Sequence, residues 1–212
     1  MMMNNWTISS ADVFKQGPVV PVLVIERVED AIPIAKALMA GGIKVLEVTL
    51  RTEAAIEVIS AIAKGVPDSY IGAGTVTNRE QLKAVTAAGA KFAISPGLTA
   101  DLLAAGKEGT IPLIPGVSNI SDLMKANDAG YDHLKFFPAE AAGGVKALKS
   151  IGGPFPNTVF CPTGGIGLGN YKEYLALPNV RCVGGSWLAP AEAIENKDWQ
   201  AITDLAKQVT GQ

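Results

Sequence analysis

Residues 133–140 carry the stretch HLKFFPAE, in which a single lysine lies inside a short apolar run. The run is typical of a β-strand that ends at a proline, and residues 144–151 behind it have the apolar spacing of a helix. This strand and helix form a unit that recurs along the chain. The stretch therefore indicates the fold as well as one unusually placed amine.

The unit occurs eight times, at intervals of roughly 20 to 30 residues. The expected strands span residues 19–25, 43–50, 70–73, 92–95, 111–114, 133–137, 158–161 and 180–184. The expected helices span residues 28–40, 52–64, 78–88, 99–107, 118 or 119 to 129, 144–151, 169–176, 190–194 and 199–209. Ahead of them, residues 6–16 predict a short N-terminal helix with a capping sequence at residues 9–12.

The strands are apolar enough to be buried on both faces, as parallel strands are. Eight such units favour an α/β fold of the closed (β/α)8, or TIM barrel, type. An open doubly wound sheet is the alternative, because the strands at 111–114 and 158–161 are short. No linker or change in composition divides the chain, so we expect a single domain over residues 1–212.

Composition excludes several classes of partner. The 212 residues are 48% hydrophobic and 18% charged, with a net charge of −2. Because the basic residues are scattered among acids, we expect no nucleic-acid or membrane partner. The start lacks the pattern of a signal peptide and the apolar runs are strand-sized, so we expect a cytoplasmic protein. Cys161 and Cys182 have no ligand spacing and are expected to be free thiols.

Lys135 is expected at the end of its strand, between aromatic neighbours. An ammonium there loses hydration, which favours the neutral, nucleophilic amine that forms an imine with a ketone. The alternative is that the side chain extends its charged end to water.

A second candidate lies in residues 43–51, IKVLEVTLR. The two-residue period of a strand places Glu47, Thr49 and Arg51 on one face, while the other face is mostly aliphatic and should meet helices. Glu47 and Arg51 are therefore expected at the mouth of the barrel, where a carboxylate is costly unless paired or functional. A structural Glu47–Arg51 ion pair is the alternative.

Glycine-rich exits follow several strands. Residues 163–167, TGGIG, and 184–187, GGSW, offer backbone amides in neighbouring loops, a pattern typical of phosphate binding in barrels. The alternative is that these glycines only satisfy tight turns. The exit at residues 72–75, GAGT, lacks a full dinucleotide fingerprint, so no nicotinamide cofactor is expected. Pro96 stiffens another exit and should form part of the pocket wall.

The chain has one histidine, His133. A multi-histidine metal centre is therefore not expected, and His133 itself is expected deeper in the core than Lys135. The groups left at the barrel mouth suit carbonyl chemistry through a lysine imine better than a metal-dependent aldol route. They are an amine, a carboxylate, a guanidinium, a hydroxyl and a pair of anion-binding loops.

Together the motifs resemble the bacterial 2-keto-3-deoxy-6-phosphogluconate (KDPG) aldolases, which in many bacteria also cleave 4-hydroxy-2-oxoglutarate (KHG). The resemblance covers nearly the whole chain, and its most specific parts are VLEVTLRT at 45–52, GAGTV at 72–76, ISPG at 94–97, KFFPAE at 135–140, CPTGGI at 161–166 and GGSW at 184–187. It implies a homotrimeric (β/α)8 aldehyde-lyase of the Entner–Doudoroff pathway. Such an enzyme uses a Schiff base without metal or cofactor and releases pyruvate and glyceraldehyde 3-phosphate.

The resemblance also implies roles for individual residues. Lys135 would form the imine, Glu47 would be the acid and base, and Arg51 with Thr75 would bind the substrate carboxylate. The phosphate would lie at Gly164, Gly165, Gly185 and Ser186, and the pocket would include Pro96, Phe137 and Thr163. Two alternatives stay open: a metal-free isomerase or decarboxylase with Glu47 as base, and a phosphosugar sensor without catalysis.

Overall fold

The computed structural model describes residues 5–212. Within this range every paired strand runs parallel to its neighbour, and the strands form two ladders with the orders β5-β4-β3-β2-β1-β9 and β6-β7-β8. The strands are β1 (Val19–Leu23), β2 (Val45–Thr49), β3 (Tyr70–Gly74), β4 (Phe92–Ile94), β5 (Leu113–Ile114), β6 (Gly116–Val117), β7 (His133–Phe136), β8 (Val159–Pro162) and β9 (Val183–Gly185). The predicted α/β fold with parallel strands is confirmed.

The break between the ladders lies at Pro115: the expected strand 111–114 is present as the shorter β5, and β6 beyond the proline was not predicted. A proline has no N–H to donate, so it interrupts a ladder, although its carbonyl accepts a hydrogen bond of 3.0 Å from the Lys135 amide. At the other break, β8 and β9 are joined only by isolated bridges, Phe160 to Val180 and Thr163 to Gly184. The last strand is therefore shorter than predicted and begins three residues later.

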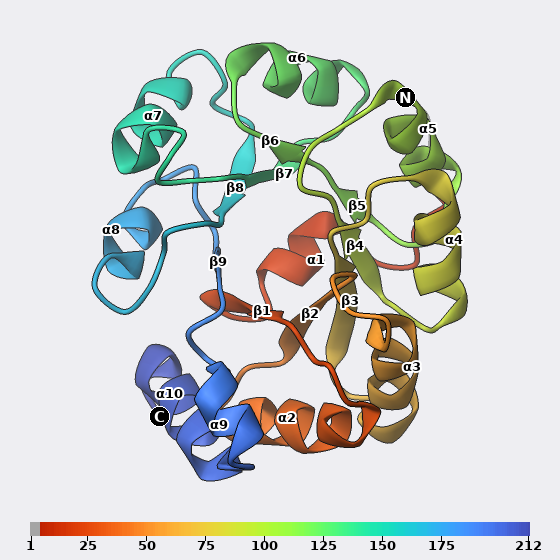
Figure 1. Cartoon of the computed structure of the whole chain (residues 1–212). Coiled ribbons are helices and arrows are strands. Elements are labelled where there is room, and N and C mark those ends of the chain that lie inside the picture. Colours follow the sequence, from red (N-terminus) through yellow and green to blue (C-terminus); the bar gives the residue numbers. More distant parts are fainter. Residues whose placement is uncertain (1–4) are drawn as a thin grey trace.

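Helices lie outside the strands, which curve around a common centre in Figure 1. Beyond a short leading helix α1 (Ser10–Phe14), they are α2 (Val28–Ala40), α3 (Ala55–Gly65), α4 (Arg79–Ala87), α5 (Ala100–Glu108), α6 (Ile120–Asp128), α7 (Gly144–Ile151), α8 (Tyr171–Leu175), α9 (Ala191–Glu195) and α10 (Trp199–Thr210). Each predicted helix is present, with ends displaced by a few residues. Within residues 5–212, none of the helices has the length and apolar character needed to cross a bilayer.

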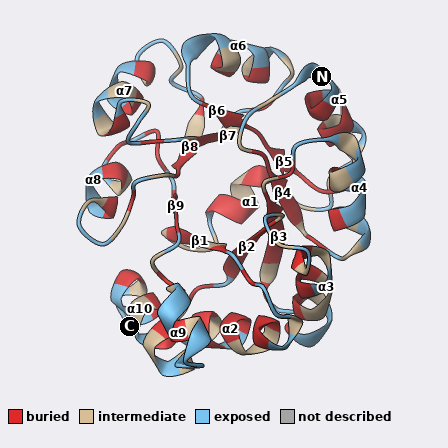
Figure 2. Ribbon diagram, in the orientation of Figure 1, coloured by how far each residue is buried: buried red, intermediate tan, exposed pale blue. Residues whose placement is uncertain are grey.

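The leading helix α1 has five residues, fewer than predicted. It begins at a capping box in which the Ser9 side chain accepts from the Asp12 amide and the Asp12 carboxylate accepts from the Ser9 amide. Its Val13 and Phe14 are buried, and Figure 2 shows α1 inside the ring of strands rather than among the outer helices. The helix therefore closes the N-terminal end of the strands.

The two faces of the strands bury different sets of side chains. An inner cluster fills the space that the strands enclose, and its members are Val13, Phe14, Val20, Val45, Phe92, Ile94, Ile114, Cys161 and Cys182. The alternate residues Leu46 and Val48 belong to the layer between strands and helices. Since Glu47 has the parity of Val45, its carboxylate points inward and not toward the helices.

Candidate functional site

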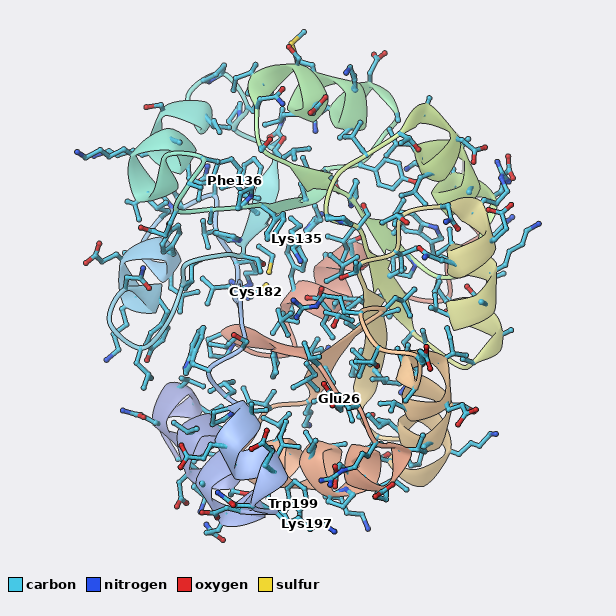
Figure 3. All side chains as sticks on the ribbon, in the orientation of Figure 1. Glu26, Lys135, Phe136, Cys182, Lys197 and Trp199 are labelled. Atoms are coloured by element: carbon cyan, nitrogen blue, oxygen red, sulfur yellow. The ribbon has the colours of Figure 1, made fainter. Side chains whose placement is uncertain are left out.

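Lys135 and Glu47 meet above the inner cluster. The Lys135 Nζ atom lies 3.3 Å from Glu47 Oε1, and only 8% of the lysine side chain and 2% of the glutamate side chain are exposed. Figure 3 shows the Lys135 side chain in the space that the strands enclose. The sequence pattern placed both groups at strand ends, and the structure brings them into direct contact from β7 and β2.

Glycine on β3 makes room for this pair. A Cβ atom at Gly74 would lie 2.1 Å from Glu47 Oε1, and one at Gly72 would lie 2.4 Å from the Phe92 ring. Any larger residue would therefore displace the carboxylate or the aromatic ring beneath it. The two glycines of the GAGT exit explain how a carboxylate and a phenylalanine fit on the inner face of neighbouring strands.

Two thiols lie below the pair. Cys161 is the register partner of Lys135 on β8, and Cys182 lies on the adjoining segment before β9; both are free and buried. Burial raises the pKa of the Cys182 thiol, and contact with Cys161 and the charge of Glu47 raise this pKa further. Figure 3 shows Cys182 near the centre of the ring. The Cys182 thiol therefore stays protonated and uncharged around neutral pH.

Arg51 follows the end of β2 and is exposed at the same mouth. Its Nε atom donates to the Thr49 hydroxyl over 3.1 Å, and that buried hydroxyl donates to the Leu23 carbonyl over 2.9 Å. Among residues 5–212, Glu47 forms its ion pair with Lys135 and not with Arg51. The alternative of a structural Glu47–Arg51 ion pair is therefore wrong, and the guanidinium has donors left for an anion.

Thr75, the other residue expected at the carboxylate, follows β3 with a φ of 61°. A threonine in this left-handed region is rare because its branched side chain is strained there. Strained residues of this kind gather at functional sites. The strain supports a site at the exit of β3 without identifying its ligand.

The predicted phosphate loops adjoin each other at the ends of β8 and β9. Gly164 and Gly165 have φ values of 102° and 76°, which glycine adopts without strain. A Cβ atom at Gly185 would lie 1.7 Å from the Trp187 ring. Within the described chain, the amides of Gly165 and Ser186 donate no hydrogen bond. These loops need glycine for packing, and they also present free donors.

The three expected pocket residues lie close to these parts. The Phe137 ring centroid is 5.2 Å from Lys135 Nζ. Pro96 follows β4, and its carbonyl lies 2.4 Å from where a Cβ atom on Gly116 would stand. Thr163 follows β8 and has a buried hydroxyl with no hydrogen-bond partner among residues 5–212. An unpartnered buried hydroxyl is costly, so this group stands out at the exit of the strand.

His133 lies at the opposite end of β7. Its ring packs against Phe14 with centroids 5.4 Å apart, and Nδ1 is 2.7 Å from Asp132 Oδ1. Its side chain is 17% exposed against 8% for Lys135, so it lies at the edge of the core and the expectation that it lies deeper than Lys135 is wrong. Across residues 5–212, no group of three or more His, Cys, Asp or Glu side chains is arranged to hold a metal ion.

Sequence reasoning missed two features of this region. The first is the hydrogen bond from Arg51 to Thr49. The strand period placed both side chains on one face, but it did not show that they would bond to each other. The buried pair Cys161 and Cys182 left no signal, because their proximity depends on the register between β8 and the next strand.

Comparison with known proteins gives a consistent result. The model of the KDPG and KHG aldolase family matches residues 11–205. A 2-dehydro-3-deoxy-phosphogluconate aldolase of Pseudoalteromonas atlantica is 70% identical over 98% of this chain and 96% of its own length. The KHG/KDPG aldolase of Escherichia coli K12 is 60% identical over 97% of each chain.

A solved structure agrees with these sequence matches. The KDPG aldolase of Legionella pneumophila, crystallised with pyruvate as a covalent carbinolamine intermediate, superposes with a TM-score of 0.96 at 56% identity, covering 97% of this chain and 100% of that one. The resemblance inferred from the sequence motifs is confirmed: the chain belongs to the KDPG and KHG aldolase family.

Proposed function

We propose that this protein is a class I aldolase that cleaves 2-keto-3-deoxy-6-phosphogluconate into pyruvate and glyceraldehyde 3-phosphate, and 4-hydroxy-2-oxoglutarate into pyruvate and glyoxylate. The observation that carries the proposal is the buried contact of 3.3 Å between Lys135 Nζ and Glu47 Oε1. A nucleophilic amine beside one carboxylate can form an imine and move the protons that each step requires.

In the first half of the reaction, neutral Lys135 adds to the C2 ketone and gives a carbinolamine. Glu47 transfers the protons that convert the C2 hydroxyl into leaving water, directly or through a water molecule. The product is a protonated imine that can accept an electron pair.

In the second half, Glu47 takes the proton of the C4 hydroxyl and the bond between C3 and C4 breaks. Its electron pair moves to the imine nitrogen, which leaves an enamine on Lys135 and releases the aldehyde. Glu47 then returns a proton to C3, and water hydrolyses the imine to pyruvate and free amine. One carboxylate thus acts as base and acid in turn, which suits the single acidic side chain in contact with Lys135.

Binding groups lie at both ends of the substrate. Arg51 would hold the pyruvate carboxylate through paired hydrogen bonds, with Thr75 beside it. The backbone at Gly164, Gly165 and Gly185, together with Ser186, would hold the phosphate. The free amides of Gly165 and Ser186 support this assignment. Pro96, Phe137 and Thr163 would line the space between the two ends, where Thr163 offers an unpartnered hydroxyl.

The same proposal includes the architecture around the site. The two ladders would close as one eight-stranded (β/α)8 barrel, with β5 and β6 as halves of one strand around Pro115, and the whole chain would be one domain. A homotrimer is supported by the exposed apolar side chains of Ile120 and Met124 on α6. A cytoplasmic location is supported by the two free cysteines. Sedimentation analysis tests the trimer.

Borohydride trapping tests the chemistry. Incubation with pyruvate and borohydride should fix a reduced adduct that peptide mapping places on Lys135, and pyruvate release from KDPG should stop in the same sample. Lys107→Ala removes another partly buried lysine and should leave trapping intact. An isomerase, a decarboxylase that uses Glu47 as base, or a sensor would give no adduct on Lys135.

A further inference from the structure

We propose that Tyr174 and Glu140 are positioning residues that set the shape of the phosphate loop at Gly164 and Gly165. This inference rests on the proposed phosphate site. Glu140 lies in the segment after Lys135, whereas Tyr174 lies on α8 and is fully buried. Their side chains connect the strand of the reactive lysine, the glycine loop and the helix that follows that loop.

The first connection is between backbones. The Ala139 amide donates to the Thr163 carbonyl over 2.8 Å, and the Glu140 amide donates to the Gly164 carbonyl over 3.1 Å. Two successive hydrogen bonds extend the contact of β7 and β8 beyond the ends of both strands. The path of the glycine loop is therefore tied to residues 139 and 140.

The second connection is the Glu140 side chain. It occupies the space beside Gly165, where a Cβ atom would lie 2.5 Å from Glu140 Cγ. At Gly144, the first residue of α7, a Cβ atom would lie 3.3 Å from Glu140 Oε1 and 3.1 Å from the Tyr174 hydroxyl. The Tyr174 hydroxyl donates a hydrogen bond to Glu140 Oε1. Two glycines thus leave room for one carboxylate, and one tyrosine fixes its direction.

The third connection holds the other side of the loop. Asn170 donates from Nδ2 to the Gly165 carbonyl over 3.0 Å, and its Oδ1 accepts from the Gly167 amide over 2.9 Å. The Gly165 carbonyl is thereby fixed, while the side chain of Glu140 packs against the Cα of the same residue. With both sides held, the free Gly165 amide keeps one orientation, which lowers the cost of ordering it around an anion.

Charge makes the direction of Glu140 important. A carboxylate that turned toward the loop would repel a bound phosphate, so it must be held toward α8. Burial raises the pKa of the Tyr174 hydroxyl, and its hydrogen bond to Glu140 raises this pKa further. The hydroxyl therefore stays protonated and remains a donor at neutral pH, where a bound phosphate is charged.

Tyr174→Phe tests the inference with two substrates that differ only in phosphate, KDPG and 2-keto-3-deoxygluconate. The variant should lower kcat/KM for KDPG by about threefold to tenfold, chiefly through KM, and leave kcat/KM for the unphosphorylated compound unchanged. Borohydride trapping of pyruvate on Lys135 should also be unchanged. A purely structural role would instead lower both values of kcat/KM together, and that result would overturn the proposal.

Tyr131→Phe is the matched control. Its hydroxyl is also buried and donates to the Leu103 carbonyl over 2.7 Å, but it lies near the N-terminal end of the strands. This variant should lose comparable thermal stability without changing the ratio of the two kcat/KM values. An equal change of the ratio in both variants would attribute the effect to lost stability and overturn the proposal.

Changes at the exposed Glu140 give a second route if Tyr174→Phe fails to fold. Glu140→Gln keeps an acceptor for Tyr174 without the charge and should retain the ratio, whereas Glu140→Ala should lower it as Tyr174→Phe does. Combining Tyr174→Phe with Glu140→Ala should add little, since the two act through one contact. Suppose Ser186→Ala lowers the ratio of kcat/KM for KDPG to kcat/KM for 2-keto-3-deoxygluconate, while Tyr174→Phe and Glu140→Ala do not; then only the positioning role is wrong. If none of the three variants lowers this ratio, the proposed phosphate site itself is wrong.

Discussion

The two ends of strand β7 carry the two most polar residues of that strand, and they differ in what surrounds them. At the N-terminal end His133 packs on Phe14 and lies beside Asp132, partly in solvent. At the C-terminal end Lys135 lies beside Glu47 in nearly complete burial. The histidine is held at the edge of the core by an aromatic ring and a surface acid, whereas the lysine and glutamate are buried against each other.

The presence of a cavity does not by itself mark the functional end of the strands. A cavity of about 540 Å³ lies at the N-terminal end, lined by Trp6, Tyr131, Lys107 and His133 among others. Its lysine donates to the Gly130 carbonyl over 2.7 Å and lies 4.2 Å from the centre of the Tyr131 ring. That cation is already satisfied, so this opening offers less chemistry than the buried contact between Lys135 and Glu47.

The largest difference between the ends should appear in a pair of lysine variants. Lys135→Ala should lower kcat by on the order of 10⁵-fold, because no other group forms the imine. Lys107→Ala, at the other end, should retain kcat. Pyruvate formation from KDPG, followed with a coupled assay, measures both. Comparable activity in the two variants would remove the distinction between the ends.

The carboxylates should differ next. Glu47→Gln should slow the proton transfers by about 10²-fold to 10⁴-fold while pyruvate binding persists, because the amide keeps the shape and loses the base. Asp132→Asn, beside His133, should leave the rate unaltered. Exchange of the pyruvate methyl protons with deuterated water, observed by NMR, reports the transfer to C3 directly. Rapid exchange in Glu47→Gln would assign the base elsewhere.

The features that could be predicted from the sequence are those whose interacting residues lie close together along the chain. The inward direction of Glu47 was predictable, because a strand alternates its faces every two residues whatever it packs against. The capping box at Ser9 was predictable for the same reason, since its partners are three residues apart. Both features depend on residues a few positions apart, so the sequence of neighbouring residues is enough to predict them.

Contacts between distant segments were not predictable in this way. Glu140 and Tyr174 are 34 residues apart and meet because α8 packs behind the glycine loop. At Pro115 the pairing changes from β4 with β5 to β6 with β7, and a proline at the end of an apolar run does not reveal that pairing resumes with a different neighbour. For the site, where residues from several strands meet, the roles of individual residues came from the family resemblance and not from the strand and helix periods.

A smaller effect is expected from Thr49, whose hydroxyl holds Arg51. Thr49→Val keeps the shape and removes the acceptor of the guanidinium, so KM for KDPG should rise by roughly threefold to tenfold with little change in kcat. Thr158, just before β8, donates a similar hydrogen bond of 3.0 Å to Asn127 on α6. Thr158→Val breaks this bond and should leave KM unchanged. In an Arg51→Ala background Thr49→Val should have no further effect; a full additional loss would show that the hydroxyl acts independently of Arg51.

The smallest effect on catalysis is expected from a fully buried phenylalanine at the N-terminal end. Phe14 is buried in the inner cluster and closes that end of the strands. Phe14→Ala should reduce the free energy of unfolding by about 3 to 5 kcal/mol, as removal of a core phenylalanine does, and denaturant titration measures that loss. Because Phe14 packs on His133 at the start of β7, away from the contact between Lys135 and Glu47, kcat/KM of the folded fraction should stay near that of the unchanged protein. A large fall in kcat/KM would show that the two ends are coupled through the inner cluster, and that the N-terminal end supports catalysis as well as stability.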